Sequence, residues 1–337
     1  MSVSRIAWQT QTRPLLPRLG AVTLVLVGLA PTVLDLSDHW LYLATMTALL
    51  ALFAQSWNLP AQAGLVSFGH GAFFGVGAYA SALLSQRGHL SPWLGLLAAA
   101  VAAAITGWLA ARIAGDLPGP AFSLATLALC ETLRVVALHW TGLTEGASGI
   151  VGIPGLPWPA ILGAESPRSV RMLDYCTAAL LLGGLCAISA WIRRRPFGLA
   201  LEAVRQAEGR ADALGVNTRQ VKASVLVLSA VFGGLAGGLY AHLFRWLDPA
   251  SVFGIHLSVM PLIMAMFGGT GTLLGPVVGA AFLYLANELL FQRLASGAHL
   301  WLYGAAIVLV MVALPRGILG WLVERLGGRM GHGHGFV

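Results

Sequence analysis

The sequence predicts an all-α integral membrane protein with about ten transmembrane helices in a single domain, residues 1–337. Two observations predict this class. Hydrophobic residues make up 57% of the chain and charged residues only 10%, whereas soluble proteins contain about 25% charged residues. Apolar stretches near the length of about 20 residues that crosses a bilayer recur from residue 19 to residue 314. The gaps between them are too short for a soluble domain of ordinary size.

The expected helices share a low charge and a length close to the thickness of a bilayer core: 19–34, 40–59, 64–85, 91–113, 119–141, 172–192, 221–243, 256–268, 275–292 and 299–314. The second and third are nearly continuous, so a broken or re-entrant segment near Pro60 is an alternative. Gly71–Gly75 and Gly275–Gly279 have the same glycine spacing, and each precedes small residues with a tyrosine. This weak similarity is a hint of internal duplication.

The positions of Lys and Arg predict the orientation, because short loops that contain them stay in the cytoplasm. The most basic connection, 193–222, holds seven of them. If it is cytoplasmic, ten helices put both termini inside as well, with fourteen basic residues inside and five outside. The net charge of +7 then reflects membrane topology, and no nucleic-acid partner is expected.

Two connections are longer than turns. Residues 142–171 are rich in glycine and proline and predict an irregular extracytoplasmic loop. Residues 193–220 form a cytoplasmic insertion, in which 197–217 predicts one amphipathic helix from apolar residues at helical intervals: Leu199, Ala203, Val204, Ala207, Ala211 and Leu214. Such a helix rests on headgroups or docks into a partner. Its acidic residues favour docking, because an anionic leaflet repels them.

Ionisable residues inside a membrane are costly and are functional candidates by default. Glu131 and Arg134 share a helix face at i,i+3, which predicts a mutual ion pair. His70 and Glu288 have no obvious partner close in the sequence. In the helix 221–243, two rows of small residues at intervals of four predict close helix packing.

The sequence contains no sign of an enzyme. A nucleotide-hydrolysing P-loop needs Gly-Lys followed by Ser or Thr, and the only lysine, Lys222, follows Val221. The three cysteines lie in apolar stretches without the spacing of a metal or redox site. We expect no catalytic, cofactor or metal site in this chain.

Several segments, in order over roughly residues 50–317, resemble the LivM-type permease of bacterial branched-chain amino-acid ATP-binding-cassette importers. They are Gly64–Tyr79, Phe122–Ala128 with Glu131–Arg134, Leu143–Pro154, Pro196–Leu201 with Ala213–Asn217 and Lys222, Gly234–Tyr240, Phe267–Pro276 and Leu314–Gly317. The sequence departs from the family pattern at Pro60 and at Glu208–Asp212. There Gly209 weakens a helix by about 1 kcal/mol relative to alanine.

The resemblance implies a permease fold that translocates leucine, isoleucine, valine or related amino acids across the bacterial inner membrane. It also implies the partners: a homologous second permease, two cytoplasmic ATPases that hold ATP and magnesium, and a periplasmic solute-binding protein. Cytoplasmic insertion residues would contact the ATPase: Glu202, Arg205, Glu208, Ala211, Leu214 and Gly215. The outside loop with Thr144, Glu145 and Gly146 would face the binding protein. Solute would pass near Ser67, His70, Thr126 and Glu131.

Two other functions fit the sequence. A urea or short-chain amide permease of the same superfamily is the nearest, because the binding protein largely selects the solute in such importers. A self-contained secondary transporter would need intramembrane acidic residues for ion coupling, and Glu131 and Glu288 are the only Asp or Glu well inside the expected helices. Transport without an added ATPase would distinguish that class.

Overall fold

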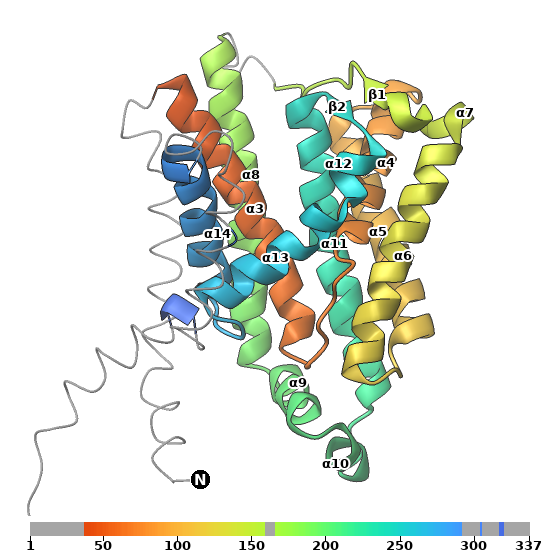
Figure 1. Ribbon diagram of the computed structural model, residues 1–337. Coiled ribbons are helices and arrows are strands. Elements are labelled where there is room, and N and C mark those ends of the chain that lie inside the picture. Colours follow the sequence, from red (N-terminus) through yellow and green to blue (C-terminus); the bar gives the residue numbers. More distant parts are fainter. Residues whose placement is uncertain (1–36, 159–165, 292–303, 305–316, 320–337) are drawn as a thin grey trace, which may run out of the picture.

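The computed structural model describes residues 37–158, 166–291, 304 and 317–319, and these consist mainly of helices (Figure 1). The elements in chain order are α3 (Asp38–Ala61), α4 (Gly71–Gln86), α5 (Pro92–Ala114), α6 (Gly119–His139), α7 (Thr141–Thr144), η1 (Gly146–Ser148), β1 (Ile150–Val151), α8 (Pro167–Arg193), α9 (Pro196–Gln206), α10 (Glu208–Ala213), α11 (Thr218–Phe244), β2 (Trp246–Leu247), α12 (Pro249–Phe253), α13 (Ile255–Gly268), α14 (Gly275–Ala286) and the π-helix η3 (Asn287–Phe291). The expected helices 19–34 and 299–314 lie outside the described residues.

Six helical stretches among the described residues are long and apolar enough to cross a membrane: 38–61, 92–114, 119–139, 167–193, 218–244 and 249–268. The predicted count of ten is therefore not confirmed. The expected helix 64–85 is broken, because regular helix begins only at Gly71. The expected helix 275–292 is an α-helix to Ala286 followed by a π-turn. The structure thus has the broken segment near Pro60 that the sequence offered as an alternative, because α3 ends at Ala61 and α4 begins at Gly71.

Helices α4, α5 and α11 pack against one another, and small residues on α11 allow this close approach (Figure 1). The two rows of small residues predicted from the sequence face different helices. A Cβ atom added to Gly234 would lie 2.3 Å from the Cβ atom of Ala103 on α5, and one added to Gly237 would lie 1.9 Å from the carbonyl oxygen of Phe74 on α4. Both contacts require glycine, which confirms the predicted close packing.

The helices group the charged connections at two opposite ends of the bundle (Figure 1). At the α9 end, Arg219 at the start of α11 forms a 2.9 Å ion pair with Asp116 between α5 and α6. At the β1 end, Arg171 at the start of α8 forms a 2.6 Å ion pair with Asp38 at the start of α3. Within the described part of the chain, this grouping agrees with the two sides predicted from Lys and Arg. The termini lie outside it.

We predict that Gly237→Ala lowers stability by about 1–3 kcal/mol, because the added methyl group has no space beside Phe74. The matched control is Gly184→Ala on α8, where an added Cβ meets no atom of the described residues within 4 Å. That change should be neutral or stabilise by up to about 1 kcal/mol. Thermal unfolding in detergent measures both, and equal midpoints for the two variants would contradict the packing described here.

Candidate functional site

The chain between α3 and α4, residues 62–70, is not helical, although helices surround it (Figure 1). Non-helical backbone at membrane depth is stable only where protein or water satisfies its polar groups. Side chains of α3 and α6 do so: Ser123 Oγ donates to the Val66 carbonyl at 2.6 Å, Trp57 Nε1 donates to the Ser67 carbonyl at 2.7 Å, and the Phe68 amide donates to Thr126 Oγ1 at 3.2 Å. Residues 62–70, hereafter the broken segment, are thus held by neighbouring helices.

The broken segment lies directly against α6. A Cβ atom added to Gly69 would lie 1.8 Å from the Thr126 carbonyl oxygen, so only glycine allows this contact. Two residues later, α4 begins at Gly71, where an added Cβ would lie 2.2 Å from Ser258 Oγ on α13. The start of α4 is therefore enclosed between α6 and α13.

Three predicted pathway residues, Ser67, His70 and Thr126, belong to this region and are buried. Thr126 Oγ1 also donates to the Ser123 carbonyl at 2.9 Å, so its single hydrogen is already used. Ser56 Oγ donates to the Phe53 carbonyl and lies 2.9 Å from His70 Nε2, so Nε2 is the nitrogen that bears the hydrogen. His70 Nδ1 then remains an acceptor, and it and Ser67 Oγ have no partner among the described residues.

The fourth predicted pathway residue, Glu131, lies one turn further along α6 than Thr126. Arg134 Nε donates to Glu131 Oε2 at 2.7 Å, which confirms the predicted ion pair. Both side chains are partly exposed, whereas Ser67, His70 and Thr126 are enclosed. The structure thus brings three of the four residues together and leaves Glu131 on the outer face of α6.

The insertion between α8 and α11 differs from the prediction of one amphipathic helix over 197–217. It forms two helices, α9 and α10, separated by Ala207 with an extended backbone of φ −163° and ψ 96°. Two contacts with α11 hold α10 at an angle that does not continue α9. Lys222 Nζ lies 2.5 Å from Glu208 Oε1, and Thr218 Oγ1 donates to Asp212 Oδ1 at 2.8 Å. The break follows from these tertiary contacts, and no glycine or proline stands at position 207.

The six predicted coupling residues fall into different environments. Glu202 and Arg205 form a 2.6 Å ion pair on α9, and the hydrogen bond from Arg205 lowers the pKa of the Glu202 carboxyl. Glu208 is paired with Lys222, whose side chain is only 3% exposed. Gly215 adopts a left-handed φ of 86° in the connection between α10 and α11. Ala211 is 2% exposed and packs inside, whereas Leu214 is 84% exposed.

Helix α9 lies next to the first part of the broken segment. A Cβ atom added to Gly64 would lie 3.6 Å from the Cα atom of Arg205, and Gly64 itself has a left-handed φ of 81°. The insertion at the α9 end therefore lies beside the segment that leads to Ser67 and His70, separated from Gly64 by about the space of one Cβ atom.

At the β1 end, residues 142–158 are ordered by a two-stranded antiparallel ribbon that pairs Ile150 with Leu247 and Val151 with Trp246. Of the predicted docking residues, Thr144 and Gly146 are buried, and Thr144 Oγ1 donates to the Ala137 carbonyl at 2.5 Å. Only Glu145 is exposed, and it lies 3.5 Å from Arg87.

Residues 40–314 match the family described as "Branched-chain amino acid transport system / permease component". The chain belongs to this family. It is 29% identical over 299 residues to the high-affinity branched-chain amino acid transport system permease protein LivM of Escherichia coli (strain K12), a match that covers 82% of this chain and 69% of LivM.

Two further relatives of this permease have other names. It is 26% identical over 268 residues to LivH of Escherichia coli (strain K12), covering 76% of this chain and 86% of LivH. It is 30% identical over 210 residues to the guanosine ABC transporter permease protein NupQ of Bacillus subtilis (strain 168), covering 58% of this chain and 62% of NupQ. No solved structure matches the chain significantly.

Sequence reasoning missed a second cluster in this permease, around the turn 269–274 between α13 and α14. Asn58 on α3 accepts from the Gly271 amide and donates to the Thr272 carbonyl, both at 2.9 Å. Arg193 at the end of α8 donates to the Gly271 carbonyl at 2.7 Å. The sequence feature that could have revealed this cluster is Asn58, a polar residue in an apolar helix close to Pro60. Such a side chain needs hydrogen-bond partners inside the membrane.

We predict that Ser123→Ala lowers stability by about 1–3 kcal/mol, because the Val66 carbonyl loses its partner in a buried position. The control is Thr132→Ala on the same helix, where the exposed hydroxyl bonds only within α6 at 2.8 Å. That change should stay within about 0.5 kcal/mol of the original chain. Thermal unfolding in detergent separates the two, and a Ser123 variant as stable as its control would show that the broken segment does not depend on this bond.

Proposed function

We propose that this chain is the permease subunit of an ATP-binding-cassette importer for leucine, isoleucine, valine or related amino acids in the bacterial inner membrane. The similarity to LivM over 82% of the chain supports the solute class. One geometric observation supports an importer driven from the cytoplasm, namely the close approach of Arg205 on α9 to Gly64 of the broken segment. The α9 end is then the cytoplasmic end, and both termini are cytoplasmic.

The proposed partners follow from the family and from the chain's own chemistry. A homologous second permease completes the translocation route, and LivH-like similarity supports such a pair. Two cytoplasmic ATPases hold ATP and magnesium and dock on the insertion 193–220, since this sequence lacks a P-loop lysine. A periplasmic solute-binding protein docks at the β1 end, where Glu145 is the exposed member of the predicted trio.

Coupling in this proposal is mechanical. ATPase closure moves α9, and α9 displaces Gly64 and the broken segment behind it. The hydrogen bonds with Ser123, Trp57 and Thr126 hold that segment in the closed arrangement, so the movement exchanges them for others. Ser67 Oγ and His70 Nδ1, which have no partner among the described residues, then face the solute as hydrogen-bonding groups.

A secondary transporter is less well supported. An ion-coupling carboxylate exchanges partners during the cycle, and Glu131 is already bonded to Arg134 on the same helix. The exposed insertion with α9 and α10 also has no role in such a protein. Uptake along an ion gradient would be the result that favours a secondary transporter in the transport experiment below.

We predict that Leu214→Asp abolishes association with the ATPase, because Leu214 is a large apolar side chain exposed on the insertion. Leu199→Asp on α9, where Leu199 is 67% exposed, should weaken association as well. Ala211→Asp does not test docking. Ala211 is buried, and a buried aspartate would unfold α10. Co-purification of the ATPase with the tagged permease measures the effect.

The matched control for docking is Leu117→Asp in the short connection between α5 and α6, which is exposed at the same end but outside the insertion. It should leave association unchanged. If Leu214→Asp and Leu117→Asp co-purify equal amounts of ATPase, docking on α10 is wrong.

Transport itself gives a separate prediction. Vesicles with this chain, its second permease, the ATPases and the binding protein should accumulate leucine only with internal ATP. Guanosine and urea serve as competing solutes for the other members of the superfamily. Uptake by the chain alone along a proton or sodium gradient would contradict the importer, and ATP-driven uptake of only guanosine or urea would replace the solute class.

A further inference from the structure

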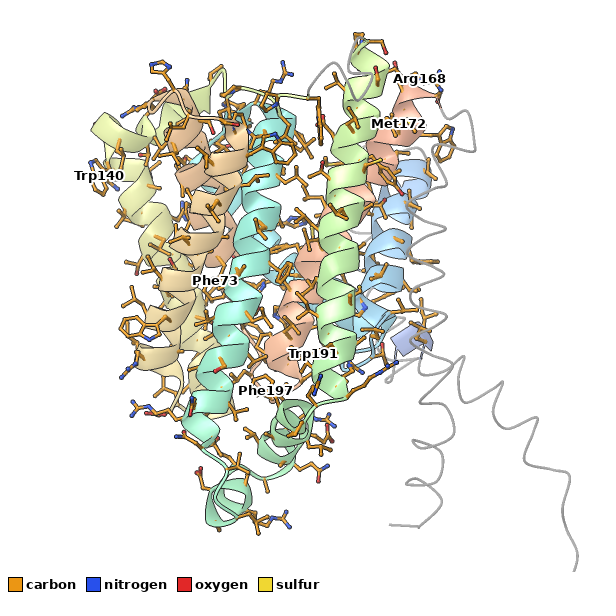
Figure 2. The ribbon with its side chains drawn as sticks, turned by 180° about the vertical axis from the view of Figure 1, so that it is seen from behind. Phe73, Trp140, Arg168, Met172, Trp191 and Phe197 are labelled. Carbon is orange, nitrogen blue, oxygen red and sulfur yellow. The ribbon has the colours of Figure 1, made fainter. Side chains whose placement is uncertain are left out.

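A groove of about 620 Å³ lies at the α9 end between α8, α9 and α11. Its lining residues are apolar or aromatic except for one serine and one arginine: Trp191, Ile192, Arg195, Pro196, Phe197, Ser224 and Leu228. Figure 2 shows Trp191 and Phe197 at the lower end of α8, beside α9. The volume is within the range of about 300–1,000 Å³ found for ligand pockets.

An exposed apolar stripe leads from this groove toward the middle of the membrane. On α8, Leu180, Gly184, Ala187 and Trp191 are all exposed and follow one another at intervals of four, three and four, which places them on one helix face. Leu180 is 75% exposed and Trp191 57% exposed. The groove is thus the end of a surface that only an apolar chain covers favourably.

The groove has a positive charge at its membrane boundary. The Arg195 guanidinium carbon lies 5.1 Å from the centre of the Trp191 ring, a cation–π contact that holds the charge over the groove. Among the residues that the structure describes, no acidic one lines the groove. Of the other two arginines in Arg193–Arg195, Arg193 bonds the Gly271 carbonyl, and Arg194 is exposed but does not line the groove.

We propose that this groove binds an anionic phospholipid of the cytoplasmic leaflet, with its phosphate on Arg195 and an acyl chain along Trp191 and the stripe on α8. The choice of the cytoplasmic leaflet rests on the orientation proposed above. Lipid binding to the groove does not depend on which solute the permease transports. Because Arg195 immediately precedes α9, the lipid touches the start of the helix that lies next to the broken segment. Tryptophan and arginine at a helix end are typical of such headgroup sites.

Brominated lipids test the proposal, because bromine on an acyl chain quenches a tryptophan that it contacts. The full chain is reconstituted in phosphatidylcholine vesicles with increasing fractions of brominated phosphatidylglycerol or, separately, brominated phosphatidylcholine. The Trp191 signal is the difference between the original chain and Trp191→Phe. We expect brominated phosphatidylglycerol to reach half-maximal quenching at a fraction about fivefold lower than brominated phosphatidylcholine does. A difference of this size corresponds to one basic residue at a membrane surface.

The variants separate this site from general attraction to basic residues. Arg195→Gln should remove the preference for phosphatidylglycerol, Arg195→Lys should keep most of it, and the control Arg194→Gln should keep it fully. Three results would overturn the proposal: equal quenching by both lipids in the original chain, an Arg194→Gln loss as large as that of Arg195→Gln, or no quenching of Trp191 by either lipid. The last result would mean that protein, such as a second copy, covers the groove. Uptake assays play no part in this test, so its failure is distinct from failure of the importer.

Discussion

The backbone of the broken segment needs hydrogen-bond partners in a place where lipid offers none, and much of the structure meets this need. Ser123 and Thr126 on α6 and Trp57 on α3 supply them. These bonds connect α3 and α6 through the broken segment, and the close approach of Gly69 to the Thr126 carbonyl holds that segment against α6. With the segment held there, α4 begins at Gly71 and packs against α11 through glycine.

The α9 end joins two non-helical elements to the surface of the bundle. Arg205 on α9 meets Gly64 in the broken segment, and Arg193 at the end of α8 bonds Gly271 in the turn 269–274. Asn58 bonds the same turn from α3, four residues before the broken segment begins. The two interruptions therefore share α3 as a common support, and a displacement of the insertion acts on both.

The sequence was sufficient to predict most of the apolar helices in the described part of the chain and the close packing of α11, because hydropathy and small-residue spacing are local properties. It could not locate the start of α4: Gly64–Gly71 is as apolar as a helix, and the break depends on Ser123 and Trp57 from other elements. The division into α9 and α10 was missed for the same reason, since Lys222 and Thr218 on α11 hold α10. Burial of Ala211 and Thr144 likewise depends on neighbours distant in the sequence.

The ion pair between Lys222 and Glu208 makes the chain unusual as a chemical target. Lys222 is the only lysine in the sequence, and its side chain is almost completely covered. Amine acylation needs an exposed, deprotonated amine, so the closed insertion protects the single side-chain site from such reagents. Each separation of α10 from α11 exposes it, so the rate at which Lys222 acquires an acyl group reports how often the insertion opens.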